Sequence, residues 1–385
     1  MANLVPIHLK IKYISWIWNI QNEDLNNNET ISAQTNTQDD FHHSCQDIIH
    51  MTQAYGLDNQ FSSIEYNHHP ATKDTISINL LSNTTTTNHV NWHVYTDGAK
   101  NDKGTGAAFT IWDTVNNTTS KEEYHKLGNH CSNNQAELWA MQQALITITK
   151  HLRIYQGNID FFTDSRYVLS VLNGTTKQTA TGIRVCYLAN NLHKKRNISF
   201  NWIPGHSGIA GNERADALAK EVTTLNVTPS FKKIPITLVK SLIHDKIMNE
   251  WQKDWTNSNT GRITYRFLPS VKDRQQLHHF FPTYGITQCI TGHGNFPAYL
   301  TRFGKRDKEN CDCDNTSKGD SLHYLLDCPN LDSERYKLFS HSINKGQNWP
   351  PKLDYLCANK EAFHLLINFI NSCNIFQTNS SNKRH

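Results

Sequence analysis

The sequence predicts an α/β domain, a five-stranded mixed sheet with flanking helices, followed by a mostly helical C-terminal region. Runs typical of short strands occur after residue 90, and they read WHVYT, GAAFTIW, EEYHKL, IDFFT and ISFNWI. Runs with a helical period lie between and after them, at 132–152, 165–172, about 178–195 and 210–222. Three strands, followed by helices that alternate with two more strands, indicate helices packed against one sheet.

The first 89 residues are interpreted as an N-terminal segment that ends in a linker. Residues 1–20 have the pattern of an amphipathic helix, whereas 21–90 show no sustained periodicity. The run SNTTTTNH at 82–89 has low complexity and is typical of a linker. We therefore place the sheet domain at 90–224.

Residues 225–375 are predicted to form a basic, mostly helical region. Five apolar residues recur there at helical spacing and most simply form the core face of one helix: Ile236, Val239, Ile243, Ile247 and Trp251. The stretch 376–385 is expected to be a disordered tail because it is rich in Asn and Ser.

The net charge of +4 conceals a gradient along the chain. Residues 1–89 carry 3 basic and 9 acidic side chains, residues 90–224 carry 14 and 11, and residues 225–385 carry 21 and 14. Phosphate backbones attract positive charge, so we expect a nucleic-acid partner toward the C-terminal two thirds. An ordinary solvated surface is the alternative.

Cysteine usage and hydropathy bear on the compartment. Nine cysteines, an odd number spread over a long chain, do not suggest a disulfide scaffold. The N-terminus has no small-residue cleavage site, and no stretch reaches the roughly 18 apolar residues that a membrane span needs. We expect an intracellular protein, nuclear or cytoplasmic, that is not secreted and has no membrane partner.

Two aspartates stand at the ends of predicted strands. Asp97 closes the strand Trp92–Thr96 and precedes Gly98, so it is expected to project into a turn. Asp164 ends the apolar strand Ile159–Thr163. A turn-forming Asp before Gly is common, so Asp97 alone does not indicate a site.

Glu137 opens the apolar face of a predicted helix. Ser132 and Gln135 form a Ser-x-x-Gln capping box that begins this helix. Glu137 then shares one helical stripe with Met141, Ala144, Leu145 and Ile148. A carboxylate on an apolar face must be paired or bound to metal, and a structural salt bridge is the alternative to metal.

Asp216 lies in a helix, one turn after Asn212 and on the same face. Strand ends and inward helix faces that meet over one edge of a sheet form the ligand sites of α/β proteins. Four converging carboxylates would repel one another unless cations neutralised them, and hard oxygen ligands favour Mg²⁺ or Mn²⁺. Such a site suits phosphoryl chemistry with two metal ions.

The four carboxylates lie in blocks that together resemble type 1 ribonuclease H. The blocks are YTDGA (95–99), NNQAELWA (133–140), FTDSRYVL (162–169) and WIPGHSGIAGNERADALAK (202–220). They follow the family's order and spacing, and the last block is the most specific. The resemblance implies a ribonuclease H-like fold and endonucleolytic hydrolysis of the RNA strand of RNA–DNA hybrids. The implied cofactors are two Mg²⁺ ions, with Mn²⁺ as a substitute.

The resemblance also implies separate roles for the site residues. Asp97 would bridge both ions, and Glu137 and Asp164 would complete the leaving-group side, with Glu137 near the RNA 2′-hydroxyl. Asp216 would hold the ion that activates water. His206 would assist proton transfer or product release, although a surface loop histidine is the alternative.

The implied substrate is an RNA–DNA hybrid, which the 2′-hydroxyl and the groove shape distinguish from DNA. By family analogy the substrate contacts are Gly98, Ala99, Asn133, Gln135 and Asn212. The basic, Trp-bearing protrusion of some family members has no obvious counterpart before the last strand. Another domain could therefore contribute to hybrid affinity.

A segment at 311–328 carries Cys311, Cys313, His323 and Cys328. Thiolates and an imidazole at such short spacings suit a closed tetrahedral Zn²⁺ site. The Cys-x-Cys gap is tighter than usual, and free cysteines in a reducing cell are the alternative.

The longer run from QLHHFF to LHYLLDC resembles the tail of Jockey- and I-type non-LTR retrotransposon polyproteins, downstream of their ribonuclease H domain. The opening LVPIHLKIKYISW weakly resembles the connection to reverse transcriptase. A polymerase is not recognised, because the pair Asp39–Asp40 lies in a polar context. The resemblance thus implies a separate reverse transcriptase as a partner.

Three functions compete at this point. The leading one is an active hybrid endonuclease, and the second is a retroelement remnant that binds nucleic acid without cutting it. A third is another nuclease of the same broad fold, such as a transposase. The presence of all four carboxylates and His206 favours the first, and the block Gly-His-Ser-Gly followed by Asn-Glu-Arg-Ala-Asp disfavours the third.

Overall fold

A computed structural model describes residues 4–21, 43–61, 76–80, 90–176 and 178–377. By their internal contacts the residues divide into two compact units, Ser15–Ile243 and Met1–Ile14 with His244–His385. The predicted linker 82–89 and the pair Asp39–Asp40 lie outside the described residues, as does most of the predicted tail. We refer to the two units as the sheet unit and the helical unit.

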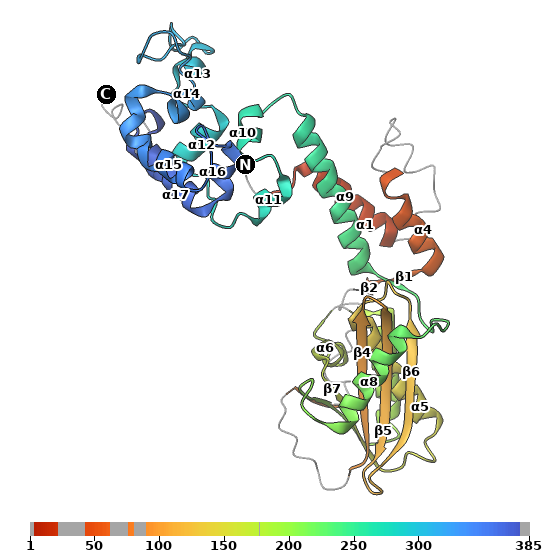
Figure 1. Cartoon of the computed structure of the whole chain (residues 1–385). Coiled ribbons are helices and arrows are strands. Elements are labelled where there is room, and N and C mark those ends of the chain that lie inside the picture. The colour runs from red at the N-terminus through yellow and green to blue at the C-terminus, as the bar shows by residue number, and fades with distance from the viewer. Residues whose placement is uncertain (1–3, 22–42, 62–75, 81–89, 177, 378–385) are drawn as a thin grey trace, which may run out of the picture. The chain divides into compact units, whose positions relative to one another are not determined.

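A six-stranded mixed sheet forms the centre of the sheet unit (Figure 1). The strand order is β3 (Ser77–Asn79), β9 (Ile198–Trp202), β7 (Asn158–Thr163), β4 (Val90–Asn101), β5 (Gly104–Asp113) and β6 (Thr118–Leu127). β4, β5 and β6 are antiparallel neighbours, whereas β3, β9, β7 and β4 run parallel. β4 carries Asp97, and Asp164 directly follows β7.

The prediction of five strands is wrong by one. β3 is three residues long and pairs with the edge strand β9, where Ile78 lies opposite Phe200. Ile76 and Ile78 are half-buried against the sheet's core. So short a strand, set in a stretch without periodicity, gave no signal that separates it from a loop.

Helices cover both faces of the sheet. α5 (Asn133–Lys150), α6 (Arg166–Leu172) and α7 (Ala180–His193) pack on one face through a core that includes Val94, Phe161 and Val185. α8 (Ala210–Thr224) packs on the other face against Ala99 and Ala108. Figure 1 shows α8 crossing the strands. Successive residues of β4 therefore face opposite layers, as the pleat of a strand requires.

Segments outside 90–224 also belong to the sheet unit. They are α4 (Gln46–Tyr55), β1 (Leu57–Asp58), β2 (Gln60–Phe61), β3, and β10 (Ile234–Pro235), which follows the domain. β1 pairs with β10, and β2 pairs with β8 (Gln178–Thr179). The predicted boundaries at residues 89 and 224 therefore do not coincide with the unit's limits, because strand pairing draws in chain from both sides.

The helical unit is built mainly from short helices. They are α10 (Arg262–Phe267), α11 (Val271–Gln276), α12 (Tyr284–Thr291), α13 (Pro297–Thr301), α14 (Ser321–Leu326), α15 (Asp332–Asn344), α16 (Leu353–Ala358) and α17 (Lys360–Ser372), with the 3₁₀ turns η4 (Pro329–Leu331) and η5 (Asn374–Phe376). α1 (Ile7–Gln21) and α9 (Ile236–Asn257) each supply residues to both units, and Lys12 pairs with Glu250 at 2.7 Å within the helical unit. The predicted helices at 1–20 and from 236 onward correspond to α1 and α9.

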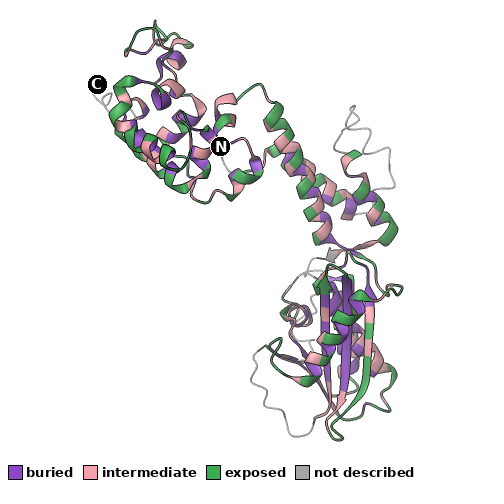
Figure 2. Ribbon diagram, in the orientation of Figure 1, coloured by how far each residue is buried: buried purple, intermediate pink, exposed green. Residues whose placement is uncertain are grey.

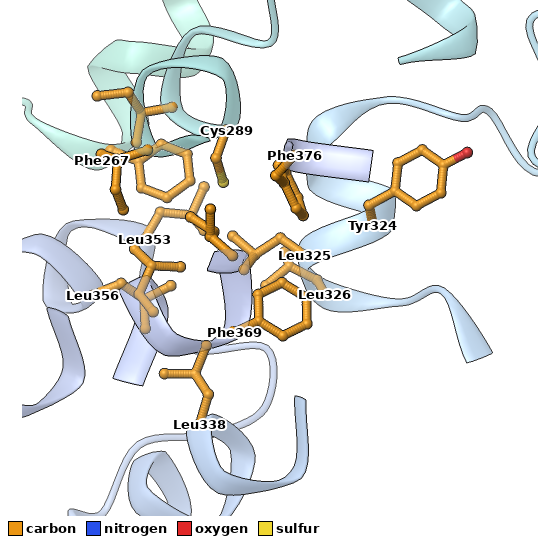
Figure 3. Close-up of a cluster of buried hydrophobic side chains, with 14 of the residues drawn as sticks. Phe267, Cys289, Tyr324, Leu325, Leu326, Leu338, Leu353, Leu356, Phe369 and Phe376 are labelled. Atoms are coloured by element: carbon orange, nitrogen blue, oxygen red, sulfur yellow. The ribbon is translucent and has the colours of Figure 1, made fainter. Parts of the chain in front are cut away.

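One apolar core holds the short helices together (Figure 3). Phe267, Leu356 and Phe369 lie in it at 2 % exposure or less. Phe376 is also fully buried there and Gln377 Nε2 donates to the Ile370 carbonyl at 3.2 Å, so the prediction that a disordered tail includes these two residues is wrong. The predicted tail includes Phe376 because polar residues follow it. In the structure its ring contacts Phe369 and Phe296.

The nine cysteines all lie in described residues, and none of them forms a disulfide. None of the helices in the described ranges combines the length and apolar character that crossing a membrane requires. Figure 2 shows the buried residues concentrated on the strands of the sheet and on the inner faces of the helices.

The stacked pair Phe161 and Phe200 offers a test of the sheet unit's core. Both rings are fully buried, and their centroids lie 4.9 Å apart. We expect Phe161→Ala to lower the free energy of unfolding of this unit by about 3–5 kcal/mol, because it removes buried apolar atoms and leaves a cavity. Tyr187→Ala, at a side chain that is 63 % exposed, should cost less than about 0.5 kcal/mol. Urea unfolding measures both, and equal losses would contradict this core.

Candidate active site

Asp97 lies inside β4 and not at its end. The strand continues to Asn101, and Asp97 pairs with Ala108 of β5. The expectation that Asp97 projects into a turn is therefore wrong. The neighbouring strand β7, however, pairs with β4 only as far as Tyr95 opposite Phe162. Asp97 lies beyond the last paired residue, so β7 does not pair with it. The C-terminal end of β7 lies beside Asp97.

Asp164 directly follows β7 at this edge. Its backbone is held by Trp202 of β9, whose Nε1 donates a hydrogen bond to the Asp164 carbonyl at 3.0 Å. The guanidinium of Arg166 lies over the Trp202 ring, 4.6 Å from its centroid. Gly205 approaches the Asp164 carboxylate so closely that a Cβ there would lie 2.7 Å from Oδ2. The backbone of Asp164 is therefore held by β9, and its carboxylate lies against Gly205 in the loop that follows β9.

Glu137 reaches the same place from the first turns of α5. The predicted capping box is present, because the Ser132 hydroxyl accepts from the Gln135 N–H while Gln135 Oε1 accepts from the Ser132 N–H. Glu137 is 4 % exposed, and its Oε1 accepts a hydrogen bond from Asn133 Nδ2 at 3.4 Å. Its Oε2 is buried without a hydrogen-bond partner. A buried carboxylate oxygen without a donor is a position that a cation can satisfy.

The carboxylates of Asp97, Glu137 and Asp164 each offer an oxygen within 4.8 Å of the others. Burial, and then the charges of Asp164 and Asp216, raise the pKa of Asp97 to about 7. Burial and the charges of Asp97 and Asp164 raise the pKa of Glu137 well above its usual range. Burial and the charge of Asp216 also raise the pKa of Asp164. The cluster thus holds negative charge that divalent cations would stabilise.

Asp216 stands beside this group on α8. It is half-buried, and its Oδ2 accepts a hydrogen bond from Lys220 at 2.7 Å, one turn along the same helix. Its ligand atoms group with those of His206 and Glu213. The structure therefore brings three of the four predicted carboxylates into one group, and the fourth acts on Asp97 and Asp164 through its charge.

His206 lies in the loop between β9 and α8, in the left-handed region with φ +53°. The side chain is exposed, and a ring nitrogen lies within 4.8 Å of carboxylate oxygens of Glu213 and Asp216. The Gly208 N–H donates to Glu213 Oε1 at 3.3 Å. Sequence reasoning missed Glu213 and Lys220, although their spacing of three and four residues from Asp216 places them on one helix face.

The predicted substrate contacts differ in how accessible their side chains are. Asn133 is exposed beside Glu137. Gln135 is 3 % exposed, Asn212 is 2 % exposed and Ala99 is 7 % exposed. These three side chains are buried in the protein, and their contact with substrate stays a prediction. Gln135 uses its amide for internal hydrogen bonds, Ala99 packs against α8, and the Oδ1 of Asn212 is buried without a partner.

Gly98 is required by packing. A Cβ at this position would lie 2.5 Å from the backbone nitrogen of Glu137, so any side chain would force β4 and α5 apart. The predicted role of Gly98 in substrate contact can therefore involve its backbone alone.

The four residues of the Cys/His segment lie together in the helical unit. Cys311, Cys313, His323 and Cys328 each offer a ligand atom within 4.8 Å of the others. Cys311 Sγ lies 3.8 Å from Cys328 Sγ, and Cys313 Sγ lies 3.4 Å from His323 Nε2. Tetrahedral bonds of about 2.3 Å to sulfur correspond to a sulfur–sulfur separation of about 3.8 Å. The arrangement therefore fits a zinc ion.

A part-buried cap and a buried guanidinium hold this cluster in shape. Asp320 caps α14, where its Oδ1 accepts from the N–H of His323 at 3.0 Å. The guanidinium of Arg335, 5 % exposed, donates to the carbonyl of Cys328 at 2.7 Å and to that of Leu325 at 2.8 Å. Two of the four candidate ligands are thus tied to the core by their backbones.

Comparisons with known proteins match part of the chain. The RNase H family model matches residues 89–224. A "Retrovirus-related Pol polyprotein from type-1 retrotransposable element R1 2" of Nasonia vitripennis is 31 % identical over 97 residues, which cover 25 % of this chain and 23 % of that protein. "Ribonuclease H" of Ruthia magnifica subsp. Calyptogena magnifica is 30 % identical over 139 residues, which cover 33 % of this chain and 90 % of that protein. Among solved structures, RNase H1 from the archaeon Halobacterium salinarum NRC-1 is 26 % identical, with 34 % of this chain and 96 % of that chain covered and a TM-score of 0.28.

The chain belongs to the ribonuclease H family, a family of enzymes, and its ribonuclease H region is related to that of R1 retrotransposon polyproteins. The predicted resemblance to type 1 ribonuclease H and to a retrotransposon polyprotein is confirmed. The chain spans 23 % or less of the length of the three R1 proteins that it matches.

The raised pKa of Asp97 predicts how the metal-free protein responds to pH. A carboxyl whose pKa rises from 3.8 to about 7 on folding is stabilising below pH 3.8, and that stability is lost as pH rises toward 7. In EDTA we expect the unfolding free energy to fall by roughly 1–3 kcal/mol between pH 5 and 8. Asp97→Asn should flatten this dependence on pH. Adding Mg²⁺ to the wild-type protein at pH 8 should restore the unfolding free energy that it loses in EDTA. Thermal melts measure this, and a metal-free profile that rises over the same range would contradict it.

Proposed function

We propose that the ribonuclease H region hydrolyses the RNA strand of RNA–DNA hybrids by a two-metal-ion mechanism, as part of a retrotransposon-derived protein. The observation that carries the proposal is the group formed by Asp97, Glu137 and Asp164. Its oxygens lie within 4.8 Å of one another, and the buried Oε2 of Glu137 has no protein partner. Membership of the ribonuclease H family supports the same activity.

The residues fit Mg²⁺, with Mn²⁺ as a substitute, because every donor is a hard carboxylate oxygen. Two divalent ions, when bound, supply a nucleophilic hydroxide and stabilise the leaving oxygen. Asp97 would contribute to both metal positions, since its charge is coupled to Asp164 and also to Asp216. Glu137 and Asp164 would hold the position on the leaving-group side, and Asp216 the position on the attacking side.

Asp216 would hold an ion either beside its ion pair with Lys220 or in exchange for it. Lys220 occupies its Oδ2 through an exposed ion pair, which is weak enough to be displaced. The ammonium of Lys220 then remains on the same helix face, where its charge acts on Asp97. His206 would hold or deliver a proton at the exposed mouth of the site, beside Asp216 and Glu213.

The substrate would be recognised as a hybrid and not as a sequence. Asn133 is exposed and hydrogen-bonded to Glu137, so its amide would lie next to the RNA 2′-hydroxyl. The Gly98 backbone lies at the same edge of the sheet. We infer that the protein acts inside the cell, in the nucleus or cytoplasm, on hybrids that a separate reverse transcriptase produces.

We also propose that Cys311, Cys313, His323 and Cys328 bind one structural Zn²⁺ ion. The sulfur–sulfur separation of 3.8 Å and the closed set of four ligands support this assignment. The ion would fix the loop before α14 to the core of the helical unit, and the basic character of residues 225–385 would let this unit contribute to nucleic-acid binding.

Cleavage of a labelled RNA–DNA hybrid tests the proposed activity. We expect Mg²⁺-dependent cutting of the RNA strand, which EDTA abolishes. Asp97→Asn should lower kcat on the order of 10³-fold, since losing a bridging ligand removes about 4 kcal/mol of transition-state stabilisation. Asp113→Asn, a carboxylate at the far end of β5 that bonds only within its own turn, should cut like the wild type. Hybrid binding without cleavage by the wild-type chain would instead support a non-cleaving remnant.

Elemental analysis tests the zinc assignment. We expect one zinc per chain, and the double variant Cys311→Ser/Cys313→Ser should lose it and unfold the helical unit at a lower temperature. Cys186→Ser changes a half-buried cysteine of the sheet unit and should keep the zinc content of the wild type. A wild-type chain without zinc after expression in zinc-supplemented medium would contradict the assignment.

A further inference from the structure

Two segments that lie outside the family-matched region pair with each other beside the site. β1 comes before this region and β10 after it, and they run parallel with Leu57 opposite Ile234 and Asp58 opposite Pro235. The Ile234 N–H donates to the Gly56 carbonyl at 2.9 Å. Both segments belong to the sheet unit. Together they form a joint, which we call the flank joint.

Asp58 is the polar residue that the flank joint buries most completely. Its side chain is 1 % exposed, and Oδ2 accepts a hydrogen bond from Gln135 Nε2 at 2.9 Å. Burial raises the pKa of this carboxyl, while Gln135 and the charge of Lys233 lower it. A buried carboxylate held mainly by a neutral amide is a poor source of stability. Its role is therefore better explained by what it orients.

Gln135 connects the flank joint to the first turn of α5. Its Nε2 donates to Asp58 and also to the carbonyl of Lys233 at 3.1 Å, one contact on each flank. Its Oε1 accepts from the Ser132 N–H at 2.9 Å and its own N–H donates to the Ser132 hydroxyl. One buried side chain thus joins both flanking segments to the cap of the helix.

The same turn of α5 carries the site. Glu137 follows Gln135 by two residues, and Asn133, two residues before Gln135, donates to the Glu137 carboxylate. We propose that Asp58, acting through Gln135, is a positioning residue that sets the orientation of Glu137 in the metal site. The inference rests on the proposed function in that it takes Glu137 as a metal ligand.

Further contacts hold the flank joint in place without Asp58. The Phe231 ring packs against Trp139 of α5 with centroids 5.0 Å apart, and the Gly128 N–H donates to the Phe231 carbonyl at 2.8 Å. Tyr55 packs on His130 at 4.7 Å. Because these contacts do not involve Asp58, a change at Asp58 should alter the orientation of the first turn of α5 while the flank joint stays packed against the rest of the sheet unit.

The test uses the full chain and three variants. Asp58→Ala removes the acceptor of the Gln135 amide. Gln135→Glu keeps the capping box, because Glu serves at that position, but it sets two carboxylates against each other. The double variant Asp58→Asn/Gln135→Glu reverses the polarity of the pair and restores the hydrogen bond between residues 58 and 135, while the hydrogen bond to the Lys233 carbonyl stays lost. Hybrid cleavage is measured against Mg²⁺ concentration, and thermal melts are recorded with and without Mg²⁺.

We expect Asp58→Ala and Gln135→Glu each to raise the Mg²⁺ concentration for half-maximal rate by about tenfold and to lower kcat, with KM for the hybrid unchanged. Relative to Gln135→Glu, the double variant should recover the part of the loss that comes from the contact between residues 58 and 135. Asp160→Ala is the matched control, because it removes a carboxylate bonded to Ser199 at 2.6 Å elsewhere in the sheet unit. It should change the melting temperature but not the Mg²⁺ dependence.

The outcomes separate this inference from the proposed function. If Asp58→Ala loses stability as Asp160→Ala does and keeps the wild-type Mg²⁺ dependence, the positioning role is overturned. If Asp58→Ala does not fold, Gln135→Glu and the double variant still decide the question. If the wild type does not cleave, the rise in melting temperature that Mg²⁺ causes replaces the rate as the readout. The inference is supported if Asp58→Ala and Gln135→Glu each lose this rise in melting temperature and the double variant regains it. The inference is overturned if the rise in the two single variants equals that of the wild type.

Discussion

β4 packs so closely against the first turn of α5 that only glycine fits at the contact, where a Cβ at Gly98 would lie 2.5 Å from the backbone nitrogen of Glu137. At Gly98 this contact sets the backbone of Glu137 against the strand that carries Asp97, and the end of β7 brings Asp164 to the same edge. The described ion pairs include none to these three carboxylates, since Lys220 pairs with Asp216 instead. The fold therefore concentrates negative charge where burial makes it costly. The repulsion among these three carboxylates lowers the stability of the metal-free protein. The same repulsion would favour the binding of divalent cations.

Several elements that carry the candidate site could be predicted because their residues lie in short contiguous patterns. Glu137 could be placed by the capping box at Ser132 and by the apolar stripe that follows it, and the structure contains both. Asp164 could be placed because an apolar strand ends just before it. The helices at 133–150, 166–172 and 210–224 follow the predicted periods, since an amphipathic helix repeats its signal over several turns.

The remaining features depend on contacts between distant parts of the chain. β4 extends past Asp97 because β5 pairs with it over its full length, and no local pattern distinguishes that from a turn before glycine. Family analogy predicts Gln135 as a substrate contact. Its hydrogen bond to Asp58 could not be predicted, because Asp58 lies 77 residues earlier in the chain. β3 and the buried Phe376 are likewise defined by what they touch. Patterns within a segment carry little information about such partners.

The pairing of β1 with β10 also gives the sheet unit a mechanical property. β1 precedes the family-matched region and β10 follows it, and the two strands run in the same direction. Tension between the chain before Leu57 and the chain after Pro235 would pull these strands past each other lengthwise, so their hydrogen bonds would share the load. A pull on either neighbouring segment would meet this shear contact before it reached β4 or α5. This contact would thus limit how far motions of the chain on either side are transmitted to the candidate site.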